Sequence, residues 1–232
     1  SPFPQKLSID TILDEKGIIQ YYVGVFTDIT FRKKTEEELR RLANFDTLTG
    51  LPNRACLFDR LSQTLDKARI RNEKFAVFKI DIDNFKRVND SFGQNTGNEL
   101  IINVARKLSN CIGGADTVAR VGGDEFIVIQ NDIESFSEGA SSADRILREL
   151  NLPIIIHGHE LTLNFSVGIT ISPDDGLSAD KLLRNADTAM YEAKKEVLNS
   201  SRFYSTDLNE KAQNKLSMEN ALRKAIDNQD IE

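Results

Sequence analysis

The sequence predicts an α+β fold in which helices cover a sheet that contains an antiparallel hairpin. Between residues 45 and 206, stretches with helical spacing of apolar residues alternate with short apolar stretches typical of strands. Two of the short stretches flank Gly122 and Gly123, and paired glycines favour a hairpin. The resulting order, β-α-β-β-α-β, is typical of a ferredoxin-like sheet with helices packed on it.

Within this zone the individual elements follow from spacing and composition. Apolar residues three or four apart predict helices over residues 57–68, 100–112, 135–150 and 182–197. Runs of β-branched and aromatic residues predict strands over residues 75–82, 154–156 and 161–171, in addition to the two strands of the hairpin. We therefore expect one continuous domain over residues 45–206.

Residues 1–30 contain a turn signal, Asp14 to Gly17, that is followed by β-branched and aromatic residues. This pattern predicts the last strands of a sheet. So short a segment cannot close a hydrophobic core by itself, and we interpret it as the remnant of an upstream domain. Because the chain does not begin with Met, we expect it to be part of a longer protein.

Residues 31–44 are rich in charge and predict a linker helix. Thr35 followed by Glu38 matches a capping box, and Leu39 with Leu42 forms a narrow apolar edge that could pair with a second copy of the chain. Residues 207–232 predict a polar connecting helix that leads out of the domain.

The bulk composition excludes some classes of function. A net charge of −6 does not provide the basic surface of a nucleic-acid-binding protein, so we expect no nucleic-acid partner. No apolar run approaches the roughly 18 residues that span a bilayer, and the N-terminus lacks a signal-peptide pattern. We expect a cytoplasmic domain with Cys56 and Cys111 reduced, and leave open whether the parent protein is attached to a membrane.

A run of carboxylates ends the strand predicted over residues 75–82. Side chains alternate between the two faces along a strand. Ile80 and Ile82 are therefore expected on the core face of the sheet. Asp81 and Asp83 are expected together on the opposite face, close to the end of the strand.

The hairpin supplies a second pair of carboxylates. Gly122 and Gly123 permit a tight two-residue turn with positive φ, which leaves Asp124 and Glu125 at its exit. If the hairpin is the neighbour of the preceding strand, Asp81 converges with these two acids. Crowded carboxylates need a hard cation, and Mg²⁺ bound together with phosphate oxygens meets that need.

The same residues also fit purely structural roles, and these alternatives stay open. A Gly-Gly-Asp hairpin is a common turn, and Asp81 or Asp83 could cap a following helix. His157 and His159 flank a glycine in an expected hairpin loop. Two exposed histidines are the simpler interpretation there, because no third metal ligand is near in the sequence.

Several separated motifs occur together in one order. They are Asp46–Arg54 (DTLTGLPNR), Asp81–Lys86 (DIDNFK) with Asn89–Asp90, Arg120–Phe126 (RVGGDEF), and Ala186–Asp187 with Tyr191–Lys194 (YEAK). In this combination, over residues 45–206, they resemble the GGDEF family, which implies a sheet of the nucleotidyl-cyclase type. Residues 18–30 resemble the end of a PAS sensor domain, and residues 207–232 resemble the lead-in to an EAL phosphodiesterase domain. The resemblance thus implies a parent protein of the PAS–GGDEF–EAL type.

The resemblance also implies a metal ion and a substrate. Asp81, the backbone carbonyl of Ile82 and Asp124 would hold Mg²⁺ (or Mn²⁺), with Glu125 as a further acidic ligand. The catalytic residues would be Asp124, Glu125 and Lys86, with one of the two acids accepting the proton of a ribose 3′-hydroxyl. The residues that would bind GTP are Asn84, Phe85, Lys86, Asn89, Gln94, Asn98, Gly122, Gly123 and Lys194.

By the same resemblance, the reaction joins two molecules of GTP into cyclic di-GMP with release of two pyrophosphates. Each 3′-oxygen attacks the α-phosphate of a GTP that a second copy of the domain holds, so the active unit would be a dimer of half-sites. Phosphoryl transfer of this kind depends on positioning and charge neutralisation.

Some positions depart from the family pattern. Gln94 and Asn98 stand where the family usually has His and Asp, and Asn98 can accept only one of the two hydrogen bonds that a guanine edge offers. Val197 and Leu198 replace a Gly-Arg pair, which removes a charged contact to phosphate. Each of these losses costs about 1–3 kcal/mol of GTP binding.

Feedback regulation is affected as well. The family's product-inhibition site is an RxxD motif, and here Gly113 occupies the position of the Arg while Asp116 remains. Without a guanidinium, capture of cyclic di-GMP at this position is not expected.

These features leave three functions open. The leading hypothesis is a diguanylate cyclase of full or weak activity, with GTP and a second copy of the chain as partners. The alternative is a catalytically degenerate GTP-binding domain that controls a downstream EAL phosphodiesterase. A third, non-enzymatic interpretation makes the chain a dimerising relay between a sensor and an output domain.

Overall fold

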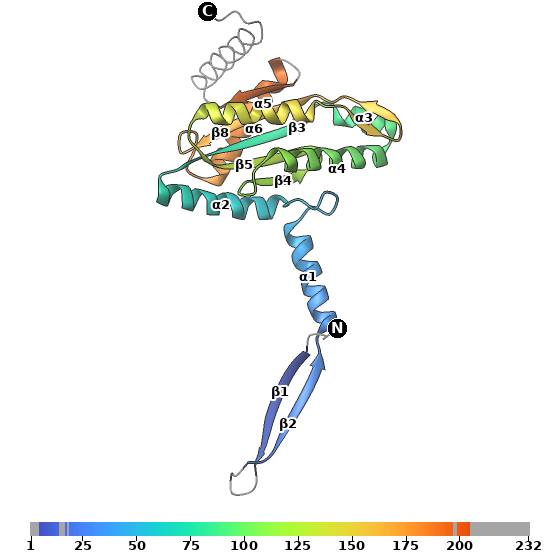
Figure 1. Cartoon of the computed structure of the whole chain (residues 1–232), viewed down its shortest axis with the longest axis vertical. Coiled ribbons are helices and arrows are strands. Elements are labelled where there is room, and N and C mark those ends of the chain that lie inside the picture. Colours follow the sequence, from blue (N-terminus) through green and yellow to red (C-terminus); the bar gives the residue numbers. More distant parts are fainter. Residues whose placement is uncertain (1–4, 14–16, 18, 197–198, 205–232) are drawn as a thin grey trace, which may run out of the picture. The chain divides into compact units, whose positions relative to one another are not determined.

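Figure 1 shows a computed structural model of the chain, which describes residues 5–13, 17, 19–196 and 199–204. The chain forms two compact units, Ser1–Asn44 and Phe45–Glu232. The helix predicted over residues 207–232 lies outside the described residues. Within the described ranges, no helix combines the length and the apolar character needed to cross a membrane.

The first unit contains an antiparallel hairpin followed by a helix. Strands β1 (Gln5–Leu13) and β2 (Ile19–Asp28) pair with each other, and α1 covers Thr30–Asn44. Apolar side chains of the hairpin such as Tyr22 and Phe26 are exposed, and no side chain described in this unit is buried. The described residues of this unit thus form no buried core, which agrees with the expectation that residues 1–30 cannot close one alone.

The start of α1 differs from the predicted capping box. The side chain of Asp28 accepts a hydrogen bond from the N–H of Thr30 at 2.8 Å, where the helix begins. The hydroxyl of Thr35 donates to the carbonyl of Phe31 at 3.0 Å, inside the helix. The capping box predicted from Thr35 and Glu38 is therefore wrong, because an acceptor earlier in the chain caps the helix.

The second unit contains a five-stranded sheet and the helices that cover it. Its helices are α2 (Arg54–Arg71), α3 (Phe85–Phe92), α4 (Gln94–Cys111), α5 (Phe136–Leu150) and α6 (Ala179–Glu196). The strands of the sheet are β3 (Lys74–Ile82), β4 (Thr117–Gly122), β5 (Glu125–Ile133), β8 (Phe165–Ser172) and β9 (Ser200–Phe203). A small separate hairpin consists of β6 (Ile154–Ile156) and β7 (His159–Leu161).

The strands of the sheet lie in the order β4-β5-β3-β8-β9. β3 pairs antiparallel with β5 on one side and with β8 on the other, and β4 pairs antiparallel with β5. β9, which the sequence did not predict, is parallel to β8 at the edge. Apart from this added strand, the order is that of a ferredoxin-like sheet, so the predicted α+β fold is confirmed.

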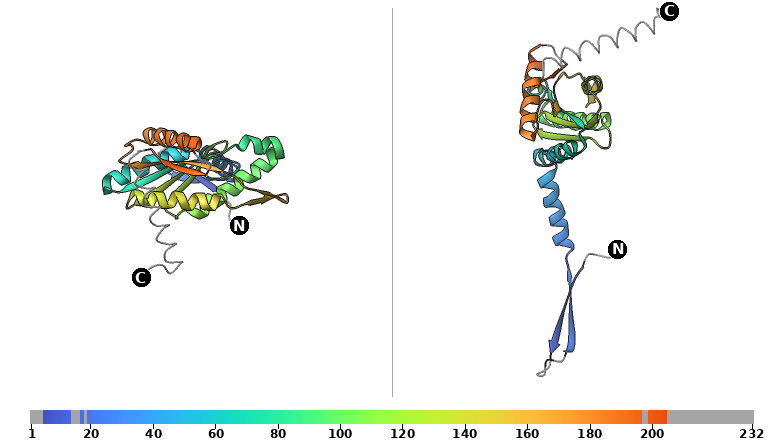
Figure 2. Two further views of the ribbon diagram at one scale, coloured as in Figure 1. Left: turned by 90° about the horizontal axis from the view of Figure 1, so that it is seen from above. Right: turned by 90° about the vertical axis from the view of Figure 1, so that its left-hand side faces the viewer.

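Both faces of the sheet are covered, and β3 is buried between two cores. Phe78 and Ile80 belong to the core on the side of α4 and α5, whereas Val77 belongs to the core on the side of α2 and α6. Figure 2 shows α5 and α6 on opposite sides of the sheet. Gly168 of β8 lets α6 come close, since a Cβ there would lie 2.0 Å from the carbonyl oxygen of Ala186. A charged side chain on β3 must therefore find a partner beneath a covering helix.

The strand predicted over residues 161–171 is in fact interrupted. β7 ends at Leu161 and pairs with β6 in the small separate hairpin, whereas β8 begins at Phe165 and pairs with β3 in the main sheet. The predicted histidine hairpin is confirmed, and its turn residue His157 has a positive φ of 50°.

Candidate active site

The β4–β5 hairpin has the tight turn that its glycines predicted. β4 ends at Gly122 and β5 begins at Glu125, and these two residues pair across the turn. Gly123 has a φ of 43°, a left-handed conformation that favours glycine. The two turn residues are thus Gly123 and Asp124 rather than the two glycines, and Asp124 lies at the tip of the hairpin.

The end of β3 lies beside this hairpin. Asp81 pairs across the sheet with Glu125 of β5 on one side and with Ser166 of β8 on the other. The condition for the predicted convergence, that the two acidic motifs lie on neighbouring strands, is met. Asp81 is only 6% exposed. This burial, together with the nearby charges of Asp124 and Glu125, raises the pKa of the Asp81 carboxyl group.

Lysine side chains lie against these acids. Nζ of Lys194 is 2.6 Å from Oδ1 of Asp81. Nζ of Lys79, near the middle of β3, is 3.2 Å from Oε1 of Glu125 and also contacts Asp187 of α6. Lys194 was predicted as a substrate-binding residue, whereas sequence reasoning missed Lys79. The signal that could have found it is a charged residue inside an otherwise apolar strand.

Asp81 is the buried acid in the predicted set of metal ligands. Its Oδ1 is buried and lies 2.6 Å from the ammonium of Lys194, but it accepts no hydrogen bond of regular geometry from the described part of the chain. A buried carboxylate oxygen with unused acceptor capacity suits a hard ion such as Mg²⁺. The donor set of Asp81, Asp124 and the carbonyl of Ile82 is therefore compatible with the predicted ion.

Glu125 does not complete a group of three acids. Among the residues that the structure describes, no three His, Cys, Asp or Glu side chains lie close enough together to hold a metal ion. Asp81 and Glu125 nevertheless lie opposite each other on neighbouring strands, and Oε1 of Glu125 lies 3.2 Å from Nζ of Lys79.

The loop between β3 and α3 rules out one structural alternative. Asn84, the residue before α3, has a left-handed φ of 58° and makes no capping hydrogen bond through its side chain. Asp83 accepts a hydrogen bond from the hydroxyl of Ser166 at 2.8 Å instead. The alternative that Asp81 or Asp83 caps this helix is therefore wrong. Lys86, in the first turn of α3, is exposed.

Several of the residues predicted to bind GTP lie where α3 meets α4. A Cβ on Gly97 would lie 1.9 Å from Oδ1 of Asn89 and 3.2 Å from Cζ of Phe85, so the helices touch closely. Oδ1 of Asn89 is buried and has no hydrogen-bond partner among the described residues. Gln94 begins α4 and is exposed, whereas Asn98 is half-buried. An unsatisfied acceptor therefore lies at the predicted base-binding position.

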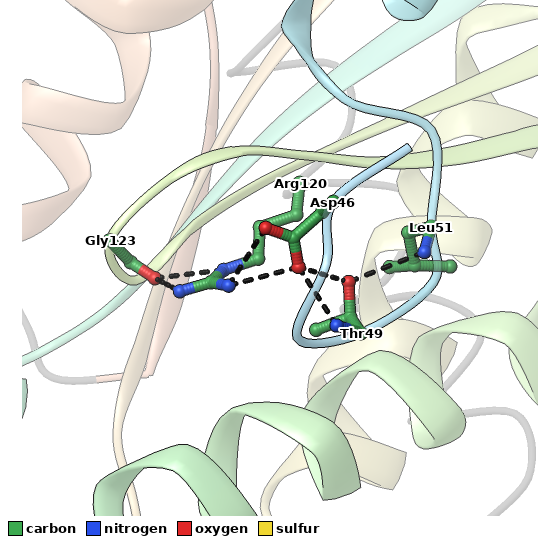
Figure 3. Close-up of polar contacts among 5 residues, drawn as sticks. All are labelled: Asp46, Thr49, Leu51, Arg120 and Gly123. Atoms are coloured by element: carbon green, nitrogen blue, oxygen red, sulfur yellow. Dashed lines mark hydrogen bonds and ion pairs between the residues drawn. The ribbon is translucent and has the colours of Figure 1, made fainter. Parts of the chain in front are cut away.

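A motif ahead of α2 is joined to the same hairpin. Nη1 of Arg120 lies 2.9 and 3.0 Å from the two carboxylate oxygens of Asp46, and Figure 3 shows the guanidinium between this carboxylate and the carbonyl of Gly123. Nε and Nη2 of Arg120 donate to that carbonyl at 3.0 and 2.6 Å. Burial opposes the charge of Asp46, but hydrogen bonds from Thr49 and Arg120 outweigh it and lower the pKa of Asp46. Sequence reasoning assigned no role to this pair.

The fold and the motifs match a known family. Residues 43–200 match the family model described as diguanylate cyclase, GGDEF domain. The chain belongs to the GGDEF domain family. The resemblance inferred from the motifs is thereby confirmed, and the match covers the second unit from just before its start to the beginning of β9.

Proteins related to this GGDEF domain carry names of opposite activities. MucR of Pseudomonas aeruginosa, named a bifunctional diguanylate cyclase/cyclic di-GMP phosphodiesterase, is 37% identical over 198 residues, which are 85% of this chain and 29% of MucR. PdeR of Escherichia coli, named a cyclic di-GMP phosphodiesterase, is 38% identical over 205 residues, which are 88% of this chain and 31% of PdeR. The chain thus spans less than a third of either relative.

A solved structure shares the fold of this GGDEF domain. That structure comprises only the GGDEF domain of TpbB (YfiN) from Pseudomonas aeruginosa. The two structures are similar with a TM-score of 0.68 and are 35% identical in sequence, and the match covers 73% of this chain and 99% of that chain. The sheet of the nucleotidyl-cyclase type that the motifs implied is confirmed by this match.

Other positions of the GGDEF domain that the sequence singled out have structural partners. Asp116 accepts the N–H groups of Gly113 at 3.1 Å and of Asn131 at 3.0 Å, so it ties a loop to β5. Nε2 of His157 lies 3.1 Å from Oε1 of Glu99, and both side chains are exposed. These contacts give Asp116 and His157 structural roles.

Proposed function

We propose that the GGDEF domain of this chain is a diguanylate cyclase, which joins two molecules of GTP into cyclic di-GMP and releases two pyrophosphates. The observation that carries the proposal is the strand register that sets the buried Asp81 opposite Glu125, at the exit of the hairpin turn. Acids at these positions are suited to an ion that binds triphosphate.

Asp81, the carbonyl of Ile82 and Asp124 would hold Mg²⁺ (or Mn²⁺). When bound, the ion neutralises charge on the phosphates. Lys194 is 35% exposed, so its ammonium can turn from Asp81 toward a phosphate oxygen. Lys86 is exposed on α3 and can approach the same triphosphate. Together these cations offset the charge that develops during phosphoryl transfer.

The bond that forms joins the ribose 3′-oxygen of one GTP to the α-phosphorus of another. The bond that breaks links this phosphorus to the bridging oxygen of pyrophosphate, which leaves with the electron pair. A carboxylate at position 124 or 125 accepts the proton of the 3′-hydroxyl. Because each GTP is both attacked and attacking, a second copy of the domain must present the partner GTP, and positioning of the two copies supplies much of the rate.

The guanine would be held at the junction of α3 and α4. Oδ1 of Asn89, buried and without a partner among the described residues, offers an acceptor to the donors of a guanine edge. Asn98 offers a second acceptor from α4, and the exposed Gln94 stands at the start of that helix. The loss of a carboxylate at position 98 weakens guanine binding, so we expect a slow enzyme.

The second candidate function is a GTP-binding domain without turnover that controls an EAL phosphodiesterase in the same parent protein. Gln94 and Asn98 favour it, because both depart from the family pattern at the base-binding position. Val197 and Leu198, the other departures, lie outside the described residues. The PAS and EAL domains of the parent remain predictions.

Incubation of the chain with GTP and Mg²⁺, followed by nucleotide chromatography, tests the cyclase. Absence of cyclic di-GMP at millimolar GTP and high protein concentration would contradict it. Calorimetry with a non-hydrolysable GTP analogue then separates the alternatives. Binding without product supports the regulatory function, whereas neither binding nor product contradicts both.

A further inference from the structure

Lys79 occupies an unusual place for a charged side chain. It lies near the middle of β3, and its neighbours across the sheet are Ile127 of β5 and Gly168 of β8. Ile127 belongs to the core on the side of α2 and α6, and the side chain of Lys79 is only 13% exposed. An ammonium group in such surroundings needs acidic partners, because an unpaired buried charge is costly.

Acids from two other elements meet this ammonium. Nζ of Lys79 lies 3.2 Å from Oε1 of Glu125 in β5 and also contacts Asp187 of α6. All three side chains line one cavity of about 400 Å³.

We propose that Lys79 is a positioning residue that holds Glu125 on the side of α6 and withholds it from the metal ion. The inference rests on the proposed function, since it concerns the ion that Asp81 and Asp124 would bind. Glu125 lies directly opposite Asp81, so without Lys79 both carboxylates could approach one ion. The lack of a three-acid cluster in the described part of the chain agrees with this role.

Binding of Mn²⁺ alone to the whole 232-residue chain tests the inference without nucleotide or turnover. Lys79→Met removes the ammonium and keeps a side chain of similar length. We expect the Kd for Mn²⁺, measured from the electron paramagnetic resonance signal of the free ion, to fall about fivefold to tenfold. The affinity for Mn²⁺ should rise for two reasons: the substitution removes a positive charge that repels the ion, and it frees the carboxylate of Glu125. Lys79→Arg, which restores the charge, should return the Kd to within about twofold of the parent.

Two control experiments isolate the part played by Glu125. Lys74→Met makes the same change at the other end of β3, where Lys74 pairs with Asp174 at 2.7 Å, and it should leave the Kd unchanged. Lys79→Met is also made in a Glu125→Gln background. If the freed carboxylate of Glu125 becomes a ligand of the ion, Lys79→Met should lower the Kd for Mn²⁺ by less than about twofold in that background.

Three outcomes overturn the inference: an unchanged Kd in Lys79→Met, an equal gain in the Glu125→Gln background, or no Mn²⁺ binding by parent and variant alike. Lys79→Gln is measured in parallel, with circular dichroism as the check on folding, so that the result does not depend on one substitution. A parent chain that binds Mn²⁺ and responds as expected but makes no cyclic di-GMP would contradict the proposed function and leave this inference standing.

Discussion

Asp46 and Arg120 are 74 residues apart in the sequence and meet as an ion pair, with Nη1 of Arg120 at 2.9 and 3.0 Å from the two carboxylate oxygens. The same guanidinium donates to the carbonyl of Gly123 in the hairpin turn. The segment before α2 is thereby tied to the turn that carries Asp124. A substitution of either residue of the pair should therefore also affect the candidate active site.

Asp46→Asn should lower the free energy of unfolding by about 1–3 kcal/mol, because it weakens a charge-assisted contact whose side chains are 22% and 12% exposed. Urea denaturation at neutral pH measures the change. Asp174→Asn is the control, since Asp174 pairs with Lys74 where both side chains are about half exposed, and it should change stability by less than about 0.5 kcal/mol. Equal losses in the two variants would contradict the role given to Asp46.

The contribution of Asp46 should also depend on pH. Its pKa in the folded chain is lowered from 3.8, so the ionised group stabilises the fold above that value. This stability is lost as pH falls through the lowered pKa. The difference in free energy of unfolding between the parent and Asp46→Asn should therefore be constant from about pH 5 to 8 and shrink below about pH 4. A difference that grows on acidification would have the wrong sign.

Asp81→Asn should have the opposite effect on stability while abolishing cyclase activity. Burial and the acids nearby raise the pKa of Asp81 above 3.8, so its ionisation costs the folded state stability as pH rises through that value. In EDTA at pH 7 the free energy of unfolding of the variant should be about 0.5–2 kcal/mol higher than that of the parent. This difference should disappear below about pH 4. Urea denaturation across this pH range is the measurement. A variant less stable than the parent at pH 7 would show that Asp81 has a structural role.

Gly97→Ala should separate α3 from α4. Its Cβ would lie 1.9 Å from Oδ1 of Asn89, so either the helix or the amide must move. We expect a loss of about 1–3 kcal/mol of stability, with weaker binding of a GTP analogue by calorimetry. Gly114→Ala is the matched control, since a Cβ at Gly114 meets nothing within 4 Å. If Gly97→Ala binds the GTP analogue as tightly as the parent does, the proposal that the guanine binds at the α3–α4 junction is contradicted.

Asn98→Asp should strengthen GTP binding. A carboxylate accepts both hydrogen bonds that a guanine edge offers, and one recovered contact of about 1–3 kcal/mol lowers the Kd by about tenfold or more. Calorimetry and the rate of cyclic di-GMP formation measure the effect. Asn95→Asp adds the same charge at an exposed position of the same helix and should not reproduce it. An equal response in both variants would point to charge alone.

Much of the fold could be predicted because its signals are local. Side chains alternate along β3 and recur at helical spacing along α2 and α4, and these periods appear within a few residues. The turn at Gly123 was predictable for the same reason, since two adjacent glycines are a strong hairpin signal. The errors were local signals overridden by contacts from farther away. Asp28 capped the helix in place of Thr35, and pairing with two different sheets divided the strand predicted over residues 161–171 into β7 and β8.

By itself the sequence determined the family, the α+β class and the acidic motifs at the end of β3 and in the hairpin turn. Only the tertiary structure decided how these acids are engaged. Lys79 reaches Glu125 and Asp187 because strand register and the packing of α6 bring three separate segments to one point. The pairing of Asp46 with Arg120 likewise depends on the segment before α2 lying against β4, where the N–H of Arg120 donates to the carbonyl of Pro52 at 2.9 Å. Contacts of this kind depend on which helix covers which face, and no periodicity within either segment contains that information.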